Sequence, residues 1–153
     1  MRLLLVAAAS LLGCSGKPIA NPSNHTSAPS PRAAPGPARD LVGWATRTGG
    51  VLRLELADRN AMAAEGAGLD CKSGPPPLDH LVIEIGDGSS AGTYPAKRAQ
   101  ACPAQGTCTA LASAVVTIET HIDETDGGLG SLELTFADGG IERGKIEYDY
   151  CYR

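Results

Sequence analysis

Sulfur carries the clearest chemistry in this sequence. The chain of 153 residues has five cysteines, and Cys14 stands apart from the other four, which are Cys71, Cys102, Cys108 and Cys151. An even set of thiols pairs as disulfides in an oxidising compartment, or holds zinc together with histidine. No Cys-x-x-Cys pair is present, and the downstream histidines, His80 and His121, stand far from one another in sequence. We therefore expect two disulfides rather than a zinc site.

Catalytic motifs are missing from the residue pattern. The sequence contains no Gly-x-Ser-x-Gly elbow, no phosphate-binding loop and no His-Glu-x-x-His. We expect His80 at the start of a strand and His121 on the polar face of its strand. Nothing marks one of the downstream cysteines as an activated thiol. We expect neither an active site nor a cofactor.

Three carboxylates share one predicted turn, and these are Asp123, Glu124 and Asp126. Several carboxylate oxygens could converge there on Ca²⁺, which prefers oxygen ligands. The order of residues does not match a known calcium loop, so we expect a solvated turn and keep calcium binding as an alternative.

The first residues have the composition of a secretory leader. One positive charge precedes ten uncharged residues, a run that is too short to span a bilayer. The motif Leu11-Leu12-Gly13-Cys14 resembles the lipobox of bacterial lipoproteins. This resemblance implies that residues 1–13 are a signal peptide, that Cys14 carries diacylglycerol, and that the new amino terminus receives an acyl chain such as palmitate. Because Ser15 rather than aspartate follows, the resemblance also implies delivery to the outer membrane.

A proline-rich segment follows the predicted anchor. Residues 15–39 contain six of the eleven prolines among Ser, Ala, Asn and Gly, with few bulky apolar side chains. Such a segment cannot bury enough surface to fold. We expect residues 14–39 to be a lipidated cysteine with a disordered tether, and residues 40–153 to form a single domain.

Apolar residues of the domain alternate with polar ones at a period of two, which is typical of half-buried antiparallel strands. Such runs occur at 42–47, 51–57, 81–85, 116–122, 132–136 and 146–152. We expect a further short strand near Ala91–Tyr94, and one or two helical turns within Asp58–Gly66. Ser73–Pro77, with three prolines, should be an extended loop.

Glycine-containing turns separate these runs. Thr48-Gly49-Gly50 predicts a hairpin, and Asp126-Gly127-Gly128 and Asp138-Gly139-Gly140 divide 113–152 into a three-stranded meander. The spacing predicts an all-β fold, an antiparallel sandwich or a small barrel of six to eight strands, stapled by disulfides.

Four cysteines allow three pairings. The five residues between Cys102 and Cys108 form a natural loop, so we favour that bridge, which leaves Cys71 to pair with Cys151. In the chain-entropy model the short loop contributes about 2.4 kcal/mol and the long one about 4.5 kcal/mol.

The charge distribution limits the partners. All 17 acidic residues lie at or after Asp40, so residues 40–153 have nine bases and a net charge of −8. Such a domain is repelled by phosphate backbones, which argues against nucleic acid. An acidic stripe, interrupted by Lys145, could form from Glu119, Glu133, Glu147 and Asp149. The partner of such a stripe would be a basic protein.

Short strings across 50–151 resemble a class of small secreted lipoproteins with β domains of uncharacterised function. They are Leu52-x-Leu54-x-Leu56, Cys71, Gly92-Thr93-Tyr94, Val116-Thr117-Ile118, Gly130-Ser131-Leu132, and Asp138-Gly139-Gly140 before Cys151. The resemblance supports the fold and the Cys71–Cys151 pairing and implies no activity.

Ser90-Ala91-Gly92-Thr93-Tyr94 is similar to a strand of the membrane-bound lysozyme inhibitors, which are small β-barrel lipoproteins. We therefore expect a membrane-anchored, non-catalytic binding or structural module, with inhibition of a secreted basic enzyme such as lysozyme as the alternative. A calcium-dependent or carbohydrate-binding module is the second alternative, the latter only if Trp44 is exposed beside Tyr94.

Overall fold

The computed structural model describes residues 38–66, 78–122 and 127–151, without the side chains of 121 and 122. Several predictions fall outside this part: the leader, the lipidated Cys14, the tether up to residue 37, and the loop Ser73–Pro77. Among the described residues, no helix is long and apolar enough to cross a membrane.

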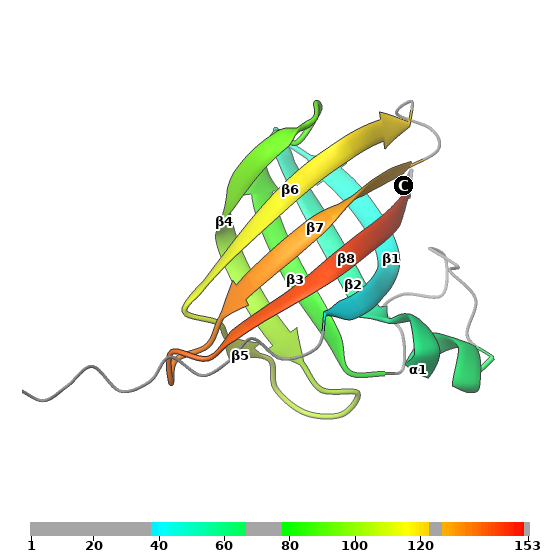
Figure 1. The fold of residues 1–153 in the computed structure, drawn as a ribbon, viewed down its shortest axis with the longest axis vertical. Helices are drawn as coiled ribbons and strands as arrows, with labels where there is room; N and C mark the ends of the chain where they lie inside the picture. Colours follow the sequence, from blue (N-terminus) through cyan, green and yellow to red (C-terminus); the bar gives the residue numbers. More distant parts are fainter. Residues whose placement is uncertain (1–37, 67–77, 123–126, 152–153) are drawn as a thin grey trace, which may run out of the picture. The chain divides into compact units, whose positions relative to one another are not determined.

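Eight strands and one short helix make up the described part (Figure 1). In chain order they are β1 (Arg39–Thr48), β2 (Val51–Asp58), α1 (Arg59–Ala64), β3 (His80–Gly86), β4 (Gly92–Cys102), β5 (Thr109–Ala110), β6 (Ser113–Ile122), β7 (Gly127–Thr135) and β8 (Ile141–Tyr150). The strand order is β3-β2-β1-β8-β7-β6-β4-β5, and β3 also pairs with β4. This additional pairing closes seven strands into a barrel, and β5 is an extra strand on β4. The prediction of an all-β sandwich or small barrel of six to eight strands is confirmed in the form of a barrel.

One neighbour pair in the barrel is parallel. β1 runs parallel to β8, from Arg39 beside Gly144 to Ala45 beside Tyr150, whereas every other described pairing is antiparallel. A closed ring of seven strands cannot alternate in direction all the way round, because seven is odd. The parallel contact follows from that count, and it places the first and last strands side by side.

The predicted hairpins are present. Gly49 and Gly50 have φ of 57° and 75° at the turn between β1 and β2, which glycine adopts without steric cost. The predicted meander corresponds to β6, β7 and β8, paired in sequence. The helical turns expected after β2 form α1, where the Asp58 side chain caps the helix by accepting from the backbone N–H groups of Asn60 and Ala61.

Strand β4 is much longer than the short strand expected near Ala91–Tyr94. It pairs with β6 through Gly92–Pro95 and with β3 through Ala96–Cys102, so it changes partner in its middle. A bulge at Lys97 lets Ala96 and Arg98 oppose consecutive residues of β3. The bulge breaks the alternation of apolar and polar residues, which is why the sequence pattern did not reveal the second half of the strand.

The barrel interior is filled by the inward residues of seven strands. The core residues are Leu41, Ala45, Leu52, Leu54, Leu56, Leu81, Ile83, Ile85, Ala99, Ala114, Val116, Ile118, Leu132, Leu134, Ile146 and Tyr148. The strands coil tightly around this core. At Gly43 on β1, a Cβ atom would lie 1.8 Å from the carbonyl oxygen of Glu55, so only glycine permits β1 and β2 to approach this closely.

A smaller apolar cluster lies under α1. Met62 from the helix packs with Val42 and Ala57, and Leu78 contacts them. Trp44, two residues beyond Val42 on β1, is only 3% exposed. This burial removes the condition on which carbohydrate binding through Trp44 depended.

Candidate functional site

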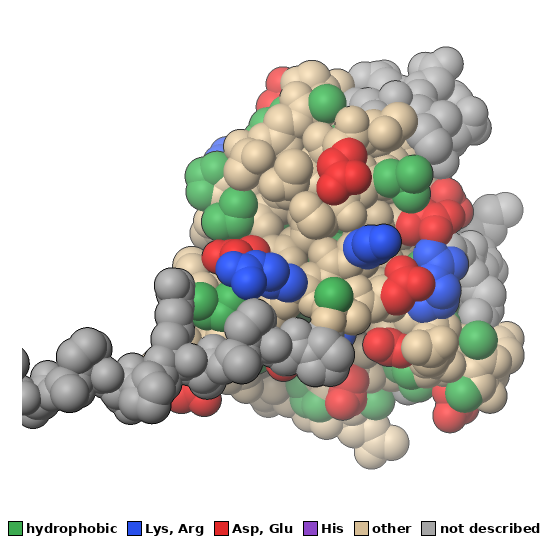
Figure 2. Space-filling model, viewed as in Figure 1, with side chains coloured by type: hydrophobic (Ala, Val, Ile, Leu, Met, Phe, Trp, Pro, Cys, Tyr) green, Lys and Arg blue, Asp and Glu red, His purple; other side chains and the backbone are tan. Residues whose placement is uncertain are grey.

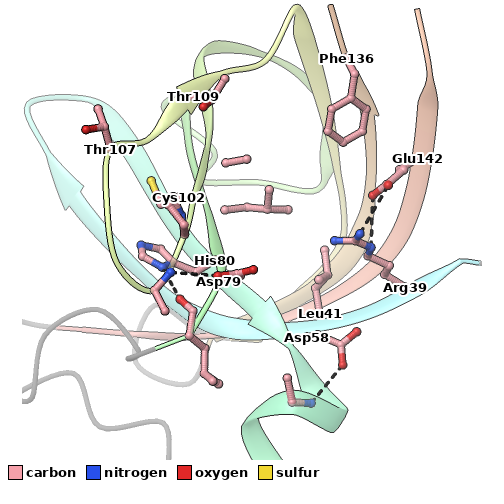
Figure 3. A pocket seen from close by; sticks show the side chains of 16 residues that line it. Arg39, Leu41, Asp58, Asp79, His80, Cys102, Thr107, Thr109, Phe136 and Glu142 are labelled. Atoms are coloured by element: carbon pink, nitrogen blue, oxygen red, sulfur yellow. Dashed lines mark hydrogen bonds and ion pairs between the residues drawn. The ribbon is translucent and has the colours of Figure 1, made fainter. Parts of the chain in front are cut away.

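A cavity of about 650 Å³ opens at the end of the barrel where β1, β3 and β8 begin (Figure 3). The described residues that line it come from the starts of those strands, the two residues before β3, the ends of β2 and β4, the loop after β4 with the start of β5, the residue after β7, and α1. Sites for small molecules occupy about 300–1,000 Å³ and occur in the mouths of β-barrels. The cavity has the size and the position of such a site.

The floor of the cavity is apolar. Leu41 and Leu81 line it and belong to the barrel core, with 3% and 6% exposure. Ala101 and Phe136 line it too and pack against the same core. The cavity is therefore an extension of the barrel interior, and an apolar group bound there would be removed from water.

An ion pair stands at the rim. Arg39 and Glu142 line the cavity near the starts of β1 and β8. Arg39 lies two residues before the core side chain of Leu41, and Glu142 lies four residues before that of Ile146. Arg39 Nε lies 3.2 Å from Glu142 Oε2, and Arg39 Nη2 donates to Oε1 at 3.4 Å (Figure 3). The parallel pairing of β1 and β8 brings these two residues together across 103 positions of sequence.

The opposite wall is fixed by hydrogen bonds to the backbone. Asp79 Oδ1 accepts from the backbone N–H of Ala104 at 2.9 Å and so attaches the loop after β4 to the start of β3. His80 begins β3, as predicted, and its Nδ1 lies 2.9 Å from the carbonyl oxygen of Leu78, to which the ring N–H donates. Figure 3 shows Asp79 and His80 across the cavity from the ion pair.

The loop after β4 is closed by the disulfide Cys102–Cys108, which confirms the favoured short-range pairing. Its residues Pro103, Ala104 and Thr107 line the cavity. Because the bridge ties the loop to the end of β4, this wall is covalently held. Cys151 is also disulfide-bonded, and its backbone N–H donates to Ala45 at 2.8 Å. Its predicted partner Cys71 lies outside the described residues.

The other end of the barrel is filled by aromatic side chains. The rings of Tyr148 and Tyr150 meet edge to face with centroids 5.8 Å apart. The Arg47 guanidinium lies 5.8 Å from the Tyr150 ring centroid and donates to its hydroxyl at 3.4 Å. Burial raises the pKa of Tyr148 above its ordinary value, and the neighbouring Tyr150 adds to the shift.

Several other predicted site residues fall in parts of the chain that the structure does not describe. Asp123, Glu124 and Asp126 lie outside the described residues, as does the side chain of His121. Within the described part, no group of three or more metal-ligating side chains occurs.

The proposed acidic stripe is interrupted by bases. Glu133 pairs with Arg143 at 2.7 Å. Arg59 pairs with Glu147, and at 3.0 Å with Asp40. Over β6, β7 and β8, Figure 2 shows acidic and basic side chains next to one another. This face of the barrel is mixed in charge rather than a continuous acidic surface.

No family model, curated protein or solved structure matches the chain.

The cavity was not foreseen from the sequence, because Arg39, Phe136 and Glu142 carry no motif and meet only through the strand order. One signal could have indicated the cavity. Arg39 and Glu142 are charged residues that continue the period of two of the inward-facing residues to the starts of β1 and β8. A charge at the end of an apolar alternation is where a barrel interior meets solvent.

Proposed function

We propose that this chain is an extracytoplasmic lipoprotein whose barrel is a non-catalytic binding module, and that the cavity beside Arg39 holds a small ligand. The observation that carries the proposal is the cavity itself, with about 650 Å³ of space over a floor made of core residues. Apolar lining with a few polar groups at the rim is the usual composition of a ligand site.

The proposals of export and membrane anchoring rest on the sequence, and the disulfide in the barrel is consistent with export. The bridge Cys102–Cys108 suits an oxidising compartment. The resemblance of residues 11–14 to a lipobox supports a lipid anchor on Cys14, and Ser15 supports delivery of the protein to the outer membrane. Two or more acyl chains give durable attachment where one chain binds only marginally.

Binding without turnover is supported by the hydrogen bonds that polar side chains around the cavity already make within the fold. Asp58 caps α1, Asp79 holds the loop after β4, and His80 bonds to Leu78. Each of these groups stabilises the wall that carries it, so none is arranged as a nucleophile with its base.

The test is NMR of the detergent-solubilised full-length protein, methyl-labelled at leucine and titrated with the neutral probe 4-phenylbutan-1-ol. We expect saturable shifts at Leu41 and Leu81 in the cavity, and none at Leu129, which is 41% exposed on β7. Ala101→Trp, which fills the cavity, should abolish the shifts, whereas Ala110→Trp on exposed β5 should not. Absence of saturable shifts in the unmodified protein would overturn the proposal.

Inhibition of a secreted basic enzyme is the second candidate, favoured by the net charge of −8 over residues 40–153. Lysozyme activity with and without micromolar full-length protein is the test. Inhibition that weakens with added salt would support it, and unchanged activity would remove it.

A further inference from the structure

We propose that the cavity selects small amphipathic cations, with an apolar body on the core floor and an amine at the rim beside Glu142. This inference rests on the proposed function, because it names the class of ligand for the same cavity.

The charges around the cavity are unequal. Among the described residues that line it, three carboxylates, from Asp58, Asp79 and Glu142, stand against one guanidinium, from Arg39. A concave site with apolar walls concentrates the field of the charge in excess. A cation entering this opening is attracted, and an anion is repelled.

Two of the carboxylates are held in place by the fold. Asp58 Oδ1 accepts two backbone N–H groups at the start of α1, at 2.9 and 3.1 Å. Asp79 Oδ1 accepts the N–H of Ala104 at 2.9 Å. Each of these bonds joins Oδ1 to a backbone donor, and it orients the carboxylate. The negative charge at this end of the barrel is therefore preorganised, and binding a cation requires little rearrangement.

Glu142 offers the most direct contact. Its Oε2 is shielded from solvent and accepts no hydrogen bond from any described residue, although it lies 3.2 Å from Arg39 Nε as an ion pair. A shielded carboxylate oxygen with an open acceptor position favours a donor of opposite charge. An ammonium N–H meets both requirements.

The apolar walls determine the rest of the ligand. Leu41, Leu81 and the half-buried Phe136 face the cavity, and Phe136 lies near Glu142 in Figure 3. A short alkyl or aryl group fits against them, because its transfer from water supplies the binding free energy that the solvated rim does not. A hydrophilic cation such as a free divalent metal ion would leave this floor uncovered.

The experiment compares three probes of one shape on detergent-solubilised full-length protein: 4-phenylbutylamine, 4-phenylbutan-1-ol and 4-phenylbutyrate. NMR shifts of Leu41 and Leu81 report dissociation constants. We expect the amine to bind about fivefold more tightly than the alcohol, the carboxylate to bind most weakly, and the preference to shrink with added salt.

Glu142→Gln should reduce the ratio of amine affinity to alcohol affinity about fivefold. The matched control is Glu133→Gln, which removes the same charge from the Glu133–Arg143 pair on the outer face and should change neither affinity. Asp58→Asn is a second test variant, because asparagine keeps the helix cap while removing the charge.

The outcomes separate the two proposals. Equal binding of the three probes, or tighter binding of the carboxylate, overturns the preference for cations and leaves the binding module standing. Loss of amine affinity in Glu133→Gln as large as in Glu142→Gln also overturns it, because the effect would then be general. If no probe shifts Leu41 or Leu81, both proposals fail.

Discussion

Gly128 of β7 lies against the ring of Tyr148 on β8. The two residues are direct partners in the antiparallel ladder, and a Cβ atom at position 128 would come within 2.4 Å of the Tyr148 hydroxyl oxygen. Tyr148 is 1% exposed and belongs to the barrel core. The largest side chain of the core therefore fits only because its partner has none.

Gly128→Ala should destabilise the barrel by about 1–3 kcal/mol, because the tyrosine ring or the strand must move to admit the methyl group. Chemical denaturation of the full-length protein measures the change. Gly86→Ala is the control: its Cβ would meet only the flexible end of Lys97 at 3.5 Å, so we expect a change within about 0.5 kcal/mol. Equal stability of Gly128→Ala and the parent would contradict the packing described here.

Tyr148 should make the protein less stable at alkaline pH. Burial raises the pKa of Tyr148 in the folded state above 10.0, its ordinary value. Above pH 10 the unfolded chain loses this proton while the folded chain keeps it, so the free energy of unfolding falls as pH rises. Denaturation at a series of pH values should show this fall, and Tyr148→Phe should lessen it. A fall of equal slope in Tyr148→Phe would show that other groups cause it.

Removing the bridge of the cavity wall should affect both stability and binding. Replacing Cys102 and Cys108 by serine together should cost about 2.4 kcal/mol by the chain-entropy model. The loop between them would lose its attachment to β4, so the probe shifts at Leu41 should also weaken. Thermal melting and the NMR titration measure the two effects. Unchanged probe affinity would show that the Asp79 hydrogen bond alone holds the wall.

Cys151 should be linked to Cys71. Cys151 is disulfide-bonded, and Cys102 and Cys108 bond to one another. Digestion without reduction followed by mass spectrometry should yield one peptide pair containing residues 71 and 151. A pair that joins Cys151 to any other cysteine would refute the assignment.

The thiol of Cys14 should carry a diacylglycerol group. Mass spectrometry of the protein purified from membranes should find a mature chain that begins at Cys14 with thioether and amide acyl groups. Cys14→Ser should leave an uncleaved, unlipidated precursor. A mature chain with an unmodified residue 14 would remove the anchor, and with it the proposed location.

Local patterns predicted those parts of the fold whose partners are close in sequence. The β1–β2 hairpin followed from Gly49 and Gly50, the meander of β6 to β8 from its turns, and the short disulfide from the spacing of Cys102 and Cys108. The second half of β4 was missed because Pro95 and the bulge at Lys97 disturb the period of two.

The candidate site depends on long-range geometry that no local pattern contains. Arg39 meets Glu142 because the ring of strands is closed by the parallel contact of β1 with β8. The sequence showed alternating strands, but the order of strands around the barrel required the structure. His80 was recognised as the start of a strand, whereas its place on the cavity wall depends on the closing β3–β4 pairing.

The position of β1 has a mechanical consequence. This strand is the first of the fold and is hydrogen-bonded on both sides, to β2 and to β8. A pull on the chain that precedes Arg39, directed along the strand, would load both ladders in shear, so that many hydrogen bonds resist together instead of opening one after another. The fold would therefore resist a pull applied at its amino-terminal end.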